Sequence, residues 1–349
     1  MTLRVALIGY GLGGSVFHAP LISSVPGLDL AAVVTGNPER QEAVRLRYPQ
    51  ARILDSPDRL WETAGSYDLA VVTVPNRQHV PLALAAIEAG LPVVVDKPVA
   101  ATVADARALA TLADERGLLV IPFHNRRWDG DFRTVRRLID EGVLGGVQRF
   151  ESRFERWRPK IKPGWKESAD PSDAGSILYD LGSHLIDQAV TLFGRPQQVY
   201  AEIDVRRPGA AVADDVFVAL THIGGLRSHL WMSATAAHLG PRFRVLGARA
   251  AYVVSGLDGQ EDALRTGHTP LEDGWGLEPP ESYGLLGTPG SMRTQPTEPG
   301  AYQDFYAGVA QAVRGEAPPP VPLADAILGL EIIEAATRSA KEGQVIKLG

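Results

Sequence analysis

The stretch Gly9-Tyr10-Gly11-Leu12-Gly13-Gly14 follows an apolar run and precedes a helical pattern. It fits G-x-G-x-x-G, in which Gly9 permits a tight turn, Gly11 lets the backbone approach a pyrophosphate and Gly14 lets helix and strand pack closely. The helix N-terminus then faces the negative charge, with Leu12 inside the loop. A structural turn or an S-adenosylmethionine site would also fit the string alone. In this context the stretch predicts dinucleotide binding.

Short apolar runs alternate with helical patterns through the first third of the chain. The predicted strands lack polar alternation, which is typical of strands covered on both faces, and are Arg4–Ile8, Leu30–Thr35, Leu69–Val74, Val93–Asp96 and Leu118–Pro122. The predicted helices between them are Pro38–Tyr48, Asn76–Ala89 and Thr102–Arg116, the last with Thr102 as N-cap and Gly117 as stop. Repeated βαβ units predict a doubly wound parallel sheet with right-handed crossovers.

The pattern changes after Pro122. The strands predicted there are Val147–Trp157, Val216–His222 and Arg227–Ser233, the last two joined across Gly224-Gly225 as a hairpin. The predicted helices are Asp131–Glu141, about Ser176–Phe193, Tyr302–Val313 and Leu323–Lys341. Residues 256–300 show little periodicity and predict a long loop region. We therefore expect an α/β chain with a Rossmann domain over 1–122 and an α+β domain with a mostly antiparallel open sheet over 123–349.

Composition excludes several classes of protein. A chain of 349 residues buries about 75% of its unfolded surface, so a large core needs no disulfide or structural metal. The net charge is −6 with scattered basic residues, which argues against a nucleic-acid partner. The chain has no cysteine and no apolar run long enough to span a bilayer. Its start reads as a first strand rather than a signal peptide, so we expect a cytoplasmic protein without a membrane partner.

The tip of the second predicted strand bears on the choice of dinucleotide. An NAD-specific site usually places an acid there to bind the ribose hydroxyls. This chain has Thr35 and Asn37, which can donate hydrogen bonds without repelling a 2′-phosphate, and Arg40 could reach that phosphate. The sequence therefore favours NADP over NAD as cofactor. In the alternative interpretation, Glu39 and Arg40 are only solvated residues in the first turn of the next helix.

Four motifs occur in an order that resembles the Gfo/Idh/MocA oxidoreductases across the whole chain. They are the glycine loop, Thr73-Val74-Pro75-Asn76-x-x-His79, Asp96-Lys97-Pro98, and Gly175 to His184 in a helical stretch. This resemblance implies an enzyme that oxidises or reduces sugars, inositols and related polyols with a nicotinamide cofactor. Phe17-His18-Ala19-Pro20-Leu21-Ile22, Asn125-Arg126-Arg127-Trp128-Asp129 and Trp157-Arg158-Pro159 look most like a branch that includes NADP-dependent scyllo-inositol dehydrogenases.

Lys97 is the first catalytic candidate. It follows an apolar strand and so lies at the carboxyl end of a parallel sheet, where ligands bind. Partial burial there lowers the pKa of an ammonium, so that it can exchange a proton with a substrate hydroxyl or carbonyl. The family resemblance implies Glu-Lys-Pro at this position, whereas this chain has the shorter Asp96.

Asp180 and His184 are the other catalytic candidates. Four residues apart in a helix, they share one face, so that the histidine can relay a proton while the aspartate orients it or binds a substrate hydroxyl. In the alternative interpretation, Asp180 caps the helix and His184 is structural. A metal site is disfavoured, because the chain has neither His-Glu-x-x-His nor a cysteine ligand.

Further residues are expected around the cofactor and the substrate. Pro75 and Asn76 end a strand at the same edge, and the amide can contact the nicotinamide ribose or cap the next helix. His79 is a weaker cofactor candidate, since a histidine in the first turn of a helix is more often structural. The substrate candidates have aromatic faces or hydrogen-bond donors, which suit a polyol ring, and are His18, Arg126, Trp157, Arg158, Trp165, Tyr179 and Tyr302.

The sequence supports an NAD(P)-dependent dehydrogenase acting on a cyclic polyol or sugar. Two alternatives stay open at this point: an NAD-dependent glycosidase that uses the redox step internally, and a nucleotide-sensing regulator without catalysis. Retention of Lys97, Asp180 and His184 argues against the regulator. The sheet of the second part needs a cover for its outer face, so we expect a homo-oligomer, a dimer or tetramer.

Overall fold

The computed structural model describes residues 2–161 and 164–349, which form two compact units. One unit contains the chain up to Asn125 together with Gln260–Trp275 and Ala301–Ala326. The other contains Arg126–Gly259, Gly276–Gly300 and Ile327–Gly349. The chain thus returns twice to the first unit after building much of the second. A division into folding domains at residues 122 and 123 stays a prediction.

The first unit is built on a six-stranded parallel sheet with the order β3-β2-β1-β4-β5-β6. Its strands are β1 (Leu3–Ile8), β2 (Leu28–Val34), β3 (Arg52–Leu54), β4 (Leu69–Val72), β5 (Val93–Val95) and β6 (Val120–Pro122). The apolar runs are buried on both faces, because crossover helices cover the sheet on either side. The predicted doubly wound sheet is confirmed. The strand β3 was not predicted, because it begins with an arginine and only one of its three residues is buried, so it lacks the apolar run of the other strands.

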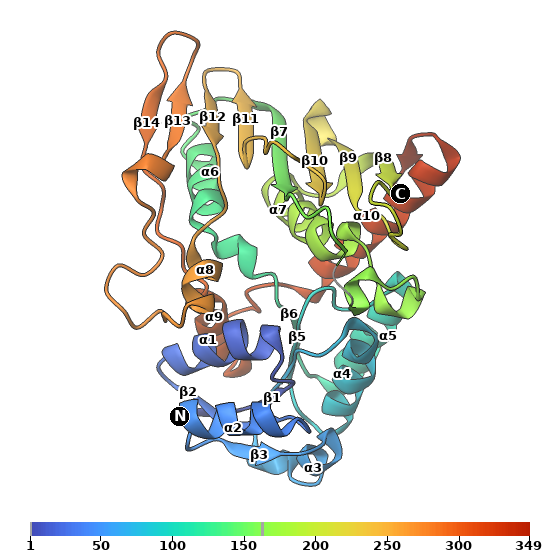
Figure 1. Cartoon of the computed structure of the whole chain (residues 1–349), viewed down its shortest axis with the longest axis vertical. Coiled ribbons are helices and arrows are strands. Elements are labelled where there is room, and N and C mark those ends of the chain that lie inside the picture. The colour runs from blue at the N-terminus through green and yellow to red at the C-terminus, as the bar shows by residue number, and fades with distance from the viewer. Residues whose placement is uncertain (1, 162–163) are drawn as a thin grey trace. The chain divides into compact units, whose positions relative to one another are not determined.

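The crossovers begin with a π-helix, η1 (Gly13–His18), which continues into α1 (Ala19–Ser24). The others are α2 (Pro38–Arg47), α3 (Pro57–Trp61), η2 (Ala64–Ser66), η3 (Asn76–Gln78), α4 (His79–Glu88) and α5 (Val103–Arg116). Both predicted ends of α5 are confirmed: the Thr102 side chain accepts the Asp105 N–H, and Gly117 has a φ of 61°. Figure 1 shows α4 and α5 side by side, in agreement with their contacts.

Two later segments complete this unit. The helix α8 (Gln260–Arg265) contacts η1, and α9 (Gln303–Val313) packs against α1. Both helices therefore lie close to the segment that follows the glycine loop (Figure 1). As a result, residues about 290 positions away in the sequence can surround the first helix.

The second unit is built on a nine-stranded sheet with the order β14-β13-β12-β11-β7-β10-β9-β8-β15. Figure 1 labels the strands from β14 to β8. Only β7 and β10 pair in parallel among its described strands. The strands are β7 (Val147–Glu155), β8 (Pro196–Asp204), β9 (Asp215–His222), β10 (Arg227–Ser233), β11 (Phe243–Gly247), β12 (Ala251–Val254), β13 (Gly284–Gly287), β14 (Arg293–Gln295) and β15 (Ile346–Lys347). The predicted mostly antiparallel sheet and its β9–β10 hairpin are confirmed.

The helices of the second unit include most of η4 (Asn125–Trp128), α6 (Gly130–Asp140), η5 (Trp165–Glu167), η6 (Pro171–Asp173), η7 (Leu178–Gly182), α7 (Ser183–Phe193), η8 (Ile223–Gly225), η9 (Pro280–Ser282) and most of α10 (Leu323–Glu342). Two sequence expectations need correction. The predicted helix over about Ser176–Phe193 is a π-helix followed by an α-helix. Residues 256–300, predicted as a loop, contain α8, β13 and β14, because β13 is set by its pairing with β12 rather than by its own pattern. None of the described helices is long and apolar enough to cross a membrane.

Candidate active site

The glycine loop between β1 and η1 is closed on one side by the end of β4. A methyl group at Gly9 would overlap the Thr73 carbonyl oxygen, and one at Gly14 would overlap the Gly9 carbonyl oxygen. Gly9 also has a φ of +102°, a backbone conformation that residues with a side chain rarely adopt. Beside Gly11 the nearest atom is a guanidinium nitrogen of Arg40, 3.8 Å from where a Cβ would stand. The loop therefore presents open backbone next to a cation, which fits the phosphates of a dinucleotide. Leu12 is exposed at its tip.

The predicted cofactor residues after β2 lie together at the start of α2. Asn37 caps this helix, and its side-chain oxygen accepts the Arg40 N–H at 3.0 Å. The Asn37 N–H in turn points to the Thr35 hydroxyl at 3.4 Å. The Arg40 guanidinium is exposed and makes no ion pair with any residue in the described part of the chain. A positive charge is thus held at the glycine loop, and none of the described carboxylates pairs with it.

Asp96 and Lys97 follow β5 at the carboxyl edge of the same sheet. Asp96 Oδ1 accepts the Lys97 backbone N–H at 2.8 Å, and Oδ2 accepts the Thr73 hydroxyl at 3.3 Å. Burial alone would raise the pKa of Asp96, but the contact with His18 and the electrostatic interactions with His18, His79 and Lys97 hold it well below its usual range. Asp96 is therefore an ionised carboxylate next to Lys97.

His79 ties the ends of two neighbouring strands together. Its Nδ1 lies 2.7 Å from the Pro98 carbonyl oxygen and its Nε2 lies 2.9 Å from the Val74 carbonyl oxygen. Burial lowers its pKa. Both ring nitrogens already face backbone acceptors, so His79 positions the segment after Lys97. Pro75 precedes η3, where Asn76 is buried in the first turn.

His18 and Tyr302, predicted as substrate contacts, are completely buried in the first unit. His18 Nδ1 lies 2.6 Å from the Tyr306 hydroxyl, and the His18 ring packs on Phe123 with centroids 4.2 Å apart. The Tyr302 N–H donates to the Gln260 side chain at 2.8 Å. Both residues belong to an aromatic cluster between η1 and α9. Their predicted contact with substrate stays a prediction.

The second unit carries Asp180 in η7 and His184 in α7. Asp180 Oδ1 accepts a hydrogen bond from Lys166 Nζ at 2.6 Å, and the aspartate side chain is 22% exposed. His184 is buried one turn further on. The π-helix widens the turn that joins them, and π turns are frequent at functional sites. Their predicted catalytic roles stay a prediction.

Two consecutive stretches of the chain match known domain families. Residues 3–124 match the NAD-binding Rossmann fold of the Gfo/Idh/MocA oxidoreductase family, and residues 136–348 match its C-terminal alpha/beta domain. The chain belongs to the Gfo/Idh/MocA oxidoreductase family. The resemblance inferred from the sequence motifs is thereby confirmed.

Several relatives align with nearly the whole chain. The scyllo-inositol 2-dehydrogenase (NADP(+)) IolW of Bacillus subtilis is 36% identical over 99% of this chain and 96% of its own. The uncharacterized oxidoreductase YdgJ of Escherichia coli is 40% identical over 97% of this chain and 96% of its own. The solved structure of the oxidoreductase yvaA from Bacillus subtilis superposes with a TM-score of 0.93 at 36% identity, covering 100% of this chain and 99% of that one.

The remaining predicted substrate residues lie in different surroundings within the second unit. Arg126 is buried, 3.4 Å from an Asp129 oxygen and stacked on Phe154. Trp157 is 59% exposed and Arg158 is also exposed. Tyr179 is partly buried, and burial, helped by the charge of Glu334, raises its pKa. In η5, Trp165 has the Lys166 ammonium 5.4 Å from its ring centroid. The structure thus groups Trp165 with Asp180 through Lys166.

Sequence reasoning missed Thr73, Lys166 and Tyr306. Thr73 stands in the quoted motif, so its hydroxyl could have been noted at the strand end. Lys166 and Tyr306 carry no local signal, because their partners Asp180 and His18 come from other segments.

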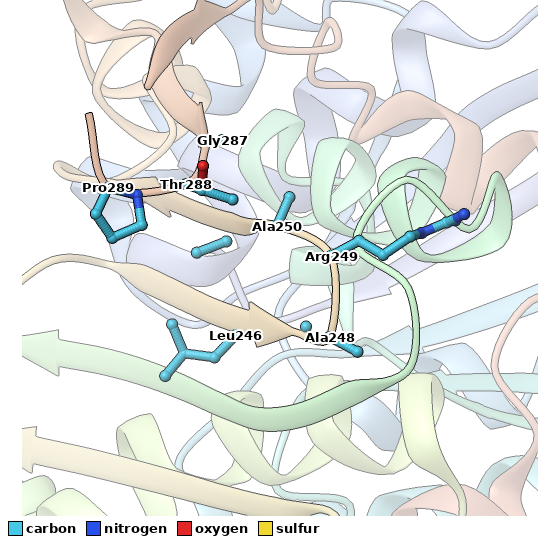
Figure 2. A pocket seen from close by; sticks show the side chains of 9 residues that line it. Leu246, Ala248, Arg249, Ala250, Gly287, Thr288 and Pro289 are labelled. Carbon is cyan, nitrogen blue, oxygen red and sulfur yellow. The ribbon is translucent and has the colours of Figure 1, made fainter. Parts of the chain in front are cut away.

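Neither a metal cluster nor a hollow in the described structure adds a catalytic group to this site. Among the described residues, no cluster of three or more histidine, aspartate or glutamate side chains could hold a metal ion. A shallow hollow of about 180 Å³ lies beside the β11–β12 turn and the end of β13, lined mostly by backbone and small side chains (Figure 2). Arg249 is the charged residue of its lining, and its guanidinium donates to the Gly142 carbonyl.

Proposed function

We propose that this chain is an NAD(P)-dependent dehydrogenase that acts on a secondary hydroxyl of a cyclic polyol or sugar. The observation that carries the proposal is the shared sheet edge: Lys97 and the ionised Asp96 follow β5, and the glycine loop follows β1 beside Thr73. The NADP-dependent scyllo-inositol relative at 36% identity supports the substrate class.

The residues of this chain divide the work of the reaction. A bound nicotinamide would accept or supply the hydride. During oxidation, Lys97 Nζ takes the proton of the substrate hydroxyl, and during reduction it returns a proton to the carbonyl oxygen. Asp180 and His184 bind the substrate hydroxyls next to the reacting one and stabilise the transfer of its proton. Arg126, Trp157, Arg158, Trp165 and Tyr179 offer donors and ring faces to the polyol.

We further propose that NADP is the preferred cofactor. Gly9, Gly11, Leu12 and Gly14 would hold the pyrophosphate, with Pro75, Asn76 and Lys97 toward the nicotinamide end. Thr35, Asn37 and Arg40 would surround the 2′-phosphate. The support is Arg40, whose guanidinium lies against Gly11 and has no carboxylate partner among the described residues. An unneutralised cation at this place favours a phosphate over a hydroxyl.

We also propose that the chain forms a homo-oligomer through the outer face of the nine-stranded sheet. Phe217, His229 and Trp231 form an aromatic row on β9 and β10, and the Arg153 guanidinium stacks 3.9 Å above the Trp231 ring. These side chains are only partly buried within one chain. Light scattering on the purified chain and on Trp231→Asp tests this, because a charge in an interface of this kind should dissociate it.

The enzymatic proposal is tested by incubating the purified chain with inositol isomers, aldoses and ketoses in the presence of NADP or NAD. Net formation of reduced cofactor with a polyol supports a dehydrogenase. The variant Lys97→Met, which should lose turnover, is the negative control. Release of a sugar without net reduction would instead indicate a glycosidase. Cofactor binding without turnover on any substrate would contradict the proposal and favour a sensor.

A further inference from the structure

A row of three side chains runs from α9 to the carboxyl end of β5. The Tyr306 hydroxyl lies 2.6 Å from His18 Nδ1, and Nε2 of the same ring lies 3.7 Å from Asp96 Oδ2. Tyr306 and His18 are completely buried, whereas the Asp96 side chain is 24% exposed. The row connects a late helix with the residue directly before Lys97.

The local backbone explains why His18 points inward. The π-helix η1 ends at His18, and its wide turn carries the ring onto Phe123 and toward α9. At the start of the same π-helix, a methyl group on Gly13 would overlap the Thr73 hydroxyl and lie 3.1 Å from Asp96 Oδ2. The row therefore adjoins the glycine loop at one end and the aromatic cluster at the other.

The two neighbours determine which nitrogen of His18 carries a proton. An ionised carboxylate only accepts hydrogen bonds, so Nε2 must be protonated to face Asp96 favourably. Burial and the charge of Asp96 raise the pKa of Tyr306 well above its usual value, so its hydroxyl keeps the proton and can donate to Nδ1. A neutral His18 is thus held as the Nε2–H tautomer. If His18 carried a proton on both ring nitrogens, Nδ1 would donate to the Tyr306 hydroxyl instead of accepting from it, and Nε2–H would still face Asp96.

The effect of this row reaches Lys97 through the carboxylate. The titratable groups that face Asp96 are His18, His79 and Lys97, and those that face His18 are Asp96 and Tyr306. The attraction between Asp96 and Lys97 acts on both groups. Loss of the His18 N–H would remove a favourable electrostatic contact 3.7 Å from the carboxylate, so Asp96 could turn and the field at Lys97 would change.

We propose that Tyr306 and His18 are positioning residues that act on Lys97 through Asp96, a role that rests on the proposed dehydrogenase function. Tyr306 fixes the ring, the ring fixes the carboxylate, and the carboxylate fixes the backbone and balances the charge of the lysine. In this way α9, a helix from the C-terminal third of the chain, helps to position Lys97, the residue that handles the substrate proton.

The kinetic test uses the isosteric variant Tyr306→Phe in the full-length chain. We expect kcat to fall about tenfold and the pH dependence of kcat to shift, while the Kd for the cofactor stays within about twofold. His18→Gln keeps an N–H donor toward Asp96 and should retain more activity than His18→Leu. The matched control is Phe305→Leu, which disturbs the ring packing around Tyr306 and Phe123 but removes none of the polar groups of the row. Tyr306→Phe with a wild-type pH profile, or Phe305→Leu with an equal shift, would overturn the proposal.

A second readout needs no turnover. Nitrogen NMR of the eight histidines, with His18 assigned by the loss of its signals in His18→Gln, reports the protonation of each ring nitrogen. We expect a protonated Nε2 and an unprotonated, hydrogen-bonded Nδ1, with the Nδ1 signal displaced in Tyr306→Phe. A proton on Nδ1 of neutral His18 would overturn the proposed row even in an active enzyme. A chain without any turnover but with the expected spectrum would contradict the dehydrogenase function and the role at Lys97, and leave only the tautomer assignment.

Discussion

Arg127 and Asp187 form a buried two-point ion pair. Arg127 Nε and Nη2 donate to the two Asp187 carboxylate oxygens at 2.9 and 2.6 Å, and the side chains are only 10% and 5% exposed. Arg127 belongs to η4 (Asn125–Trp128) and Asp187 to α7, three residues after His184. The ion pair therefore sets the position and rotation of the helix that carries His184.

We expect Asp187→Asn to lower the free energy of unfolding by roughly 3 kcal/mol, because it removes the negative charge that faces the largely buried Arg127 guanidinium at two points. The measurement is denaturant unfolding of the purified variant. Glu62→Gln is the control, since its pair with Arg59 is exposed on both sides and should contribute less than about 1 kcal/mol. Equal losses in the two variants would contradict a special role for the buried pair.

We expect Lys97→Met to lower turnover by about 10²- to 10⁴-fold while the Kd for the cofactor changes only a few fold. The reason is that Lys97 handles the substrate proton and does not hold the pyrophosphate. Lys341→Met, an exposed lysine in α10, is the matched control for the loss of one positive charge. A Lys97→Met enzyme with near-normal turnover would refute the role.

The sheet of the first unit could be predicted because its signals are local. The apolar runs, the glycine loop and the Thr102 and Gly117 ends of α5 each depend on neighbours in sequence. The burial of His18 could not be predicted, since its partner Tyr306 is 288 residues away. The π-helices were missed for a similar reason. A single π-helical turn, with hydrogen bonds between residues five apart, leaves no distinct apolar period in the sequence, and tertiary packing selects this turn over an α-helical one.

We expect Arg40→Ala to weaken NADP binding by about tenfold or more and to leave NAD binding nearly unchanged, because only NADP carries the 2′-phosphate. Calorimetry with both cofactors measures this. Arg45→Ala is the control on the same helix, since Arg45 is exposed and already paired with Glu42 at 2.9 Å. Thr35→Asp should shift the preference toward NAD by placing a carboxylate near the phosphate site. Tighter binding of NAD than of NADP by the unmodified chain would refute this view of the β2 tip.

Asp131 should make the stability of the second unit depend on pH. Burial, together with the charges of Asp129 and Asp258, raises its pKa to about 8 from an ordinary value of 3.8, although Arg242 lies 3.6 Å away. Between these values the unfolded chain releases a proton that the folded chain keeps. The contribution of Asp131 to stability is therefore complete below about pH 4 and is lost as the pH rises through about 8.

We therefore expect Asp131→Asn to become steadily more stable relative to the wild type between pH 5 and about pH 8, by at most about 1.4 kcal/mol per pH unit. Denaturant midpoints at a series of pH values give this difference. Asp29→Asn, at an exposed position, should keep a constant difference. A difference that is flat for Asp131→Asn, or that runs in the opposite direction, would show that Asp131 is ionised in the folded chain.

The last prediction concerns Asp180 and His184, which η7 and α7 place on consecutive turns. If both act on the substrate as one unit, His184→Ala and Asp180→Ala should each lower the oxidation rate by at least about tenfold. The double variant should lose less than the product of the two effects, because residues that share one task share their contribution. Asp204→Ala, which removes an exposed partner of Arg206, is the surface control. Steady-state kinetics on the four proteins of the cycle decides the matter: losses that multiply would mean that the two residues act separately, and a His184→Ala enzyme at full rate would make His184 a structural residue of α7.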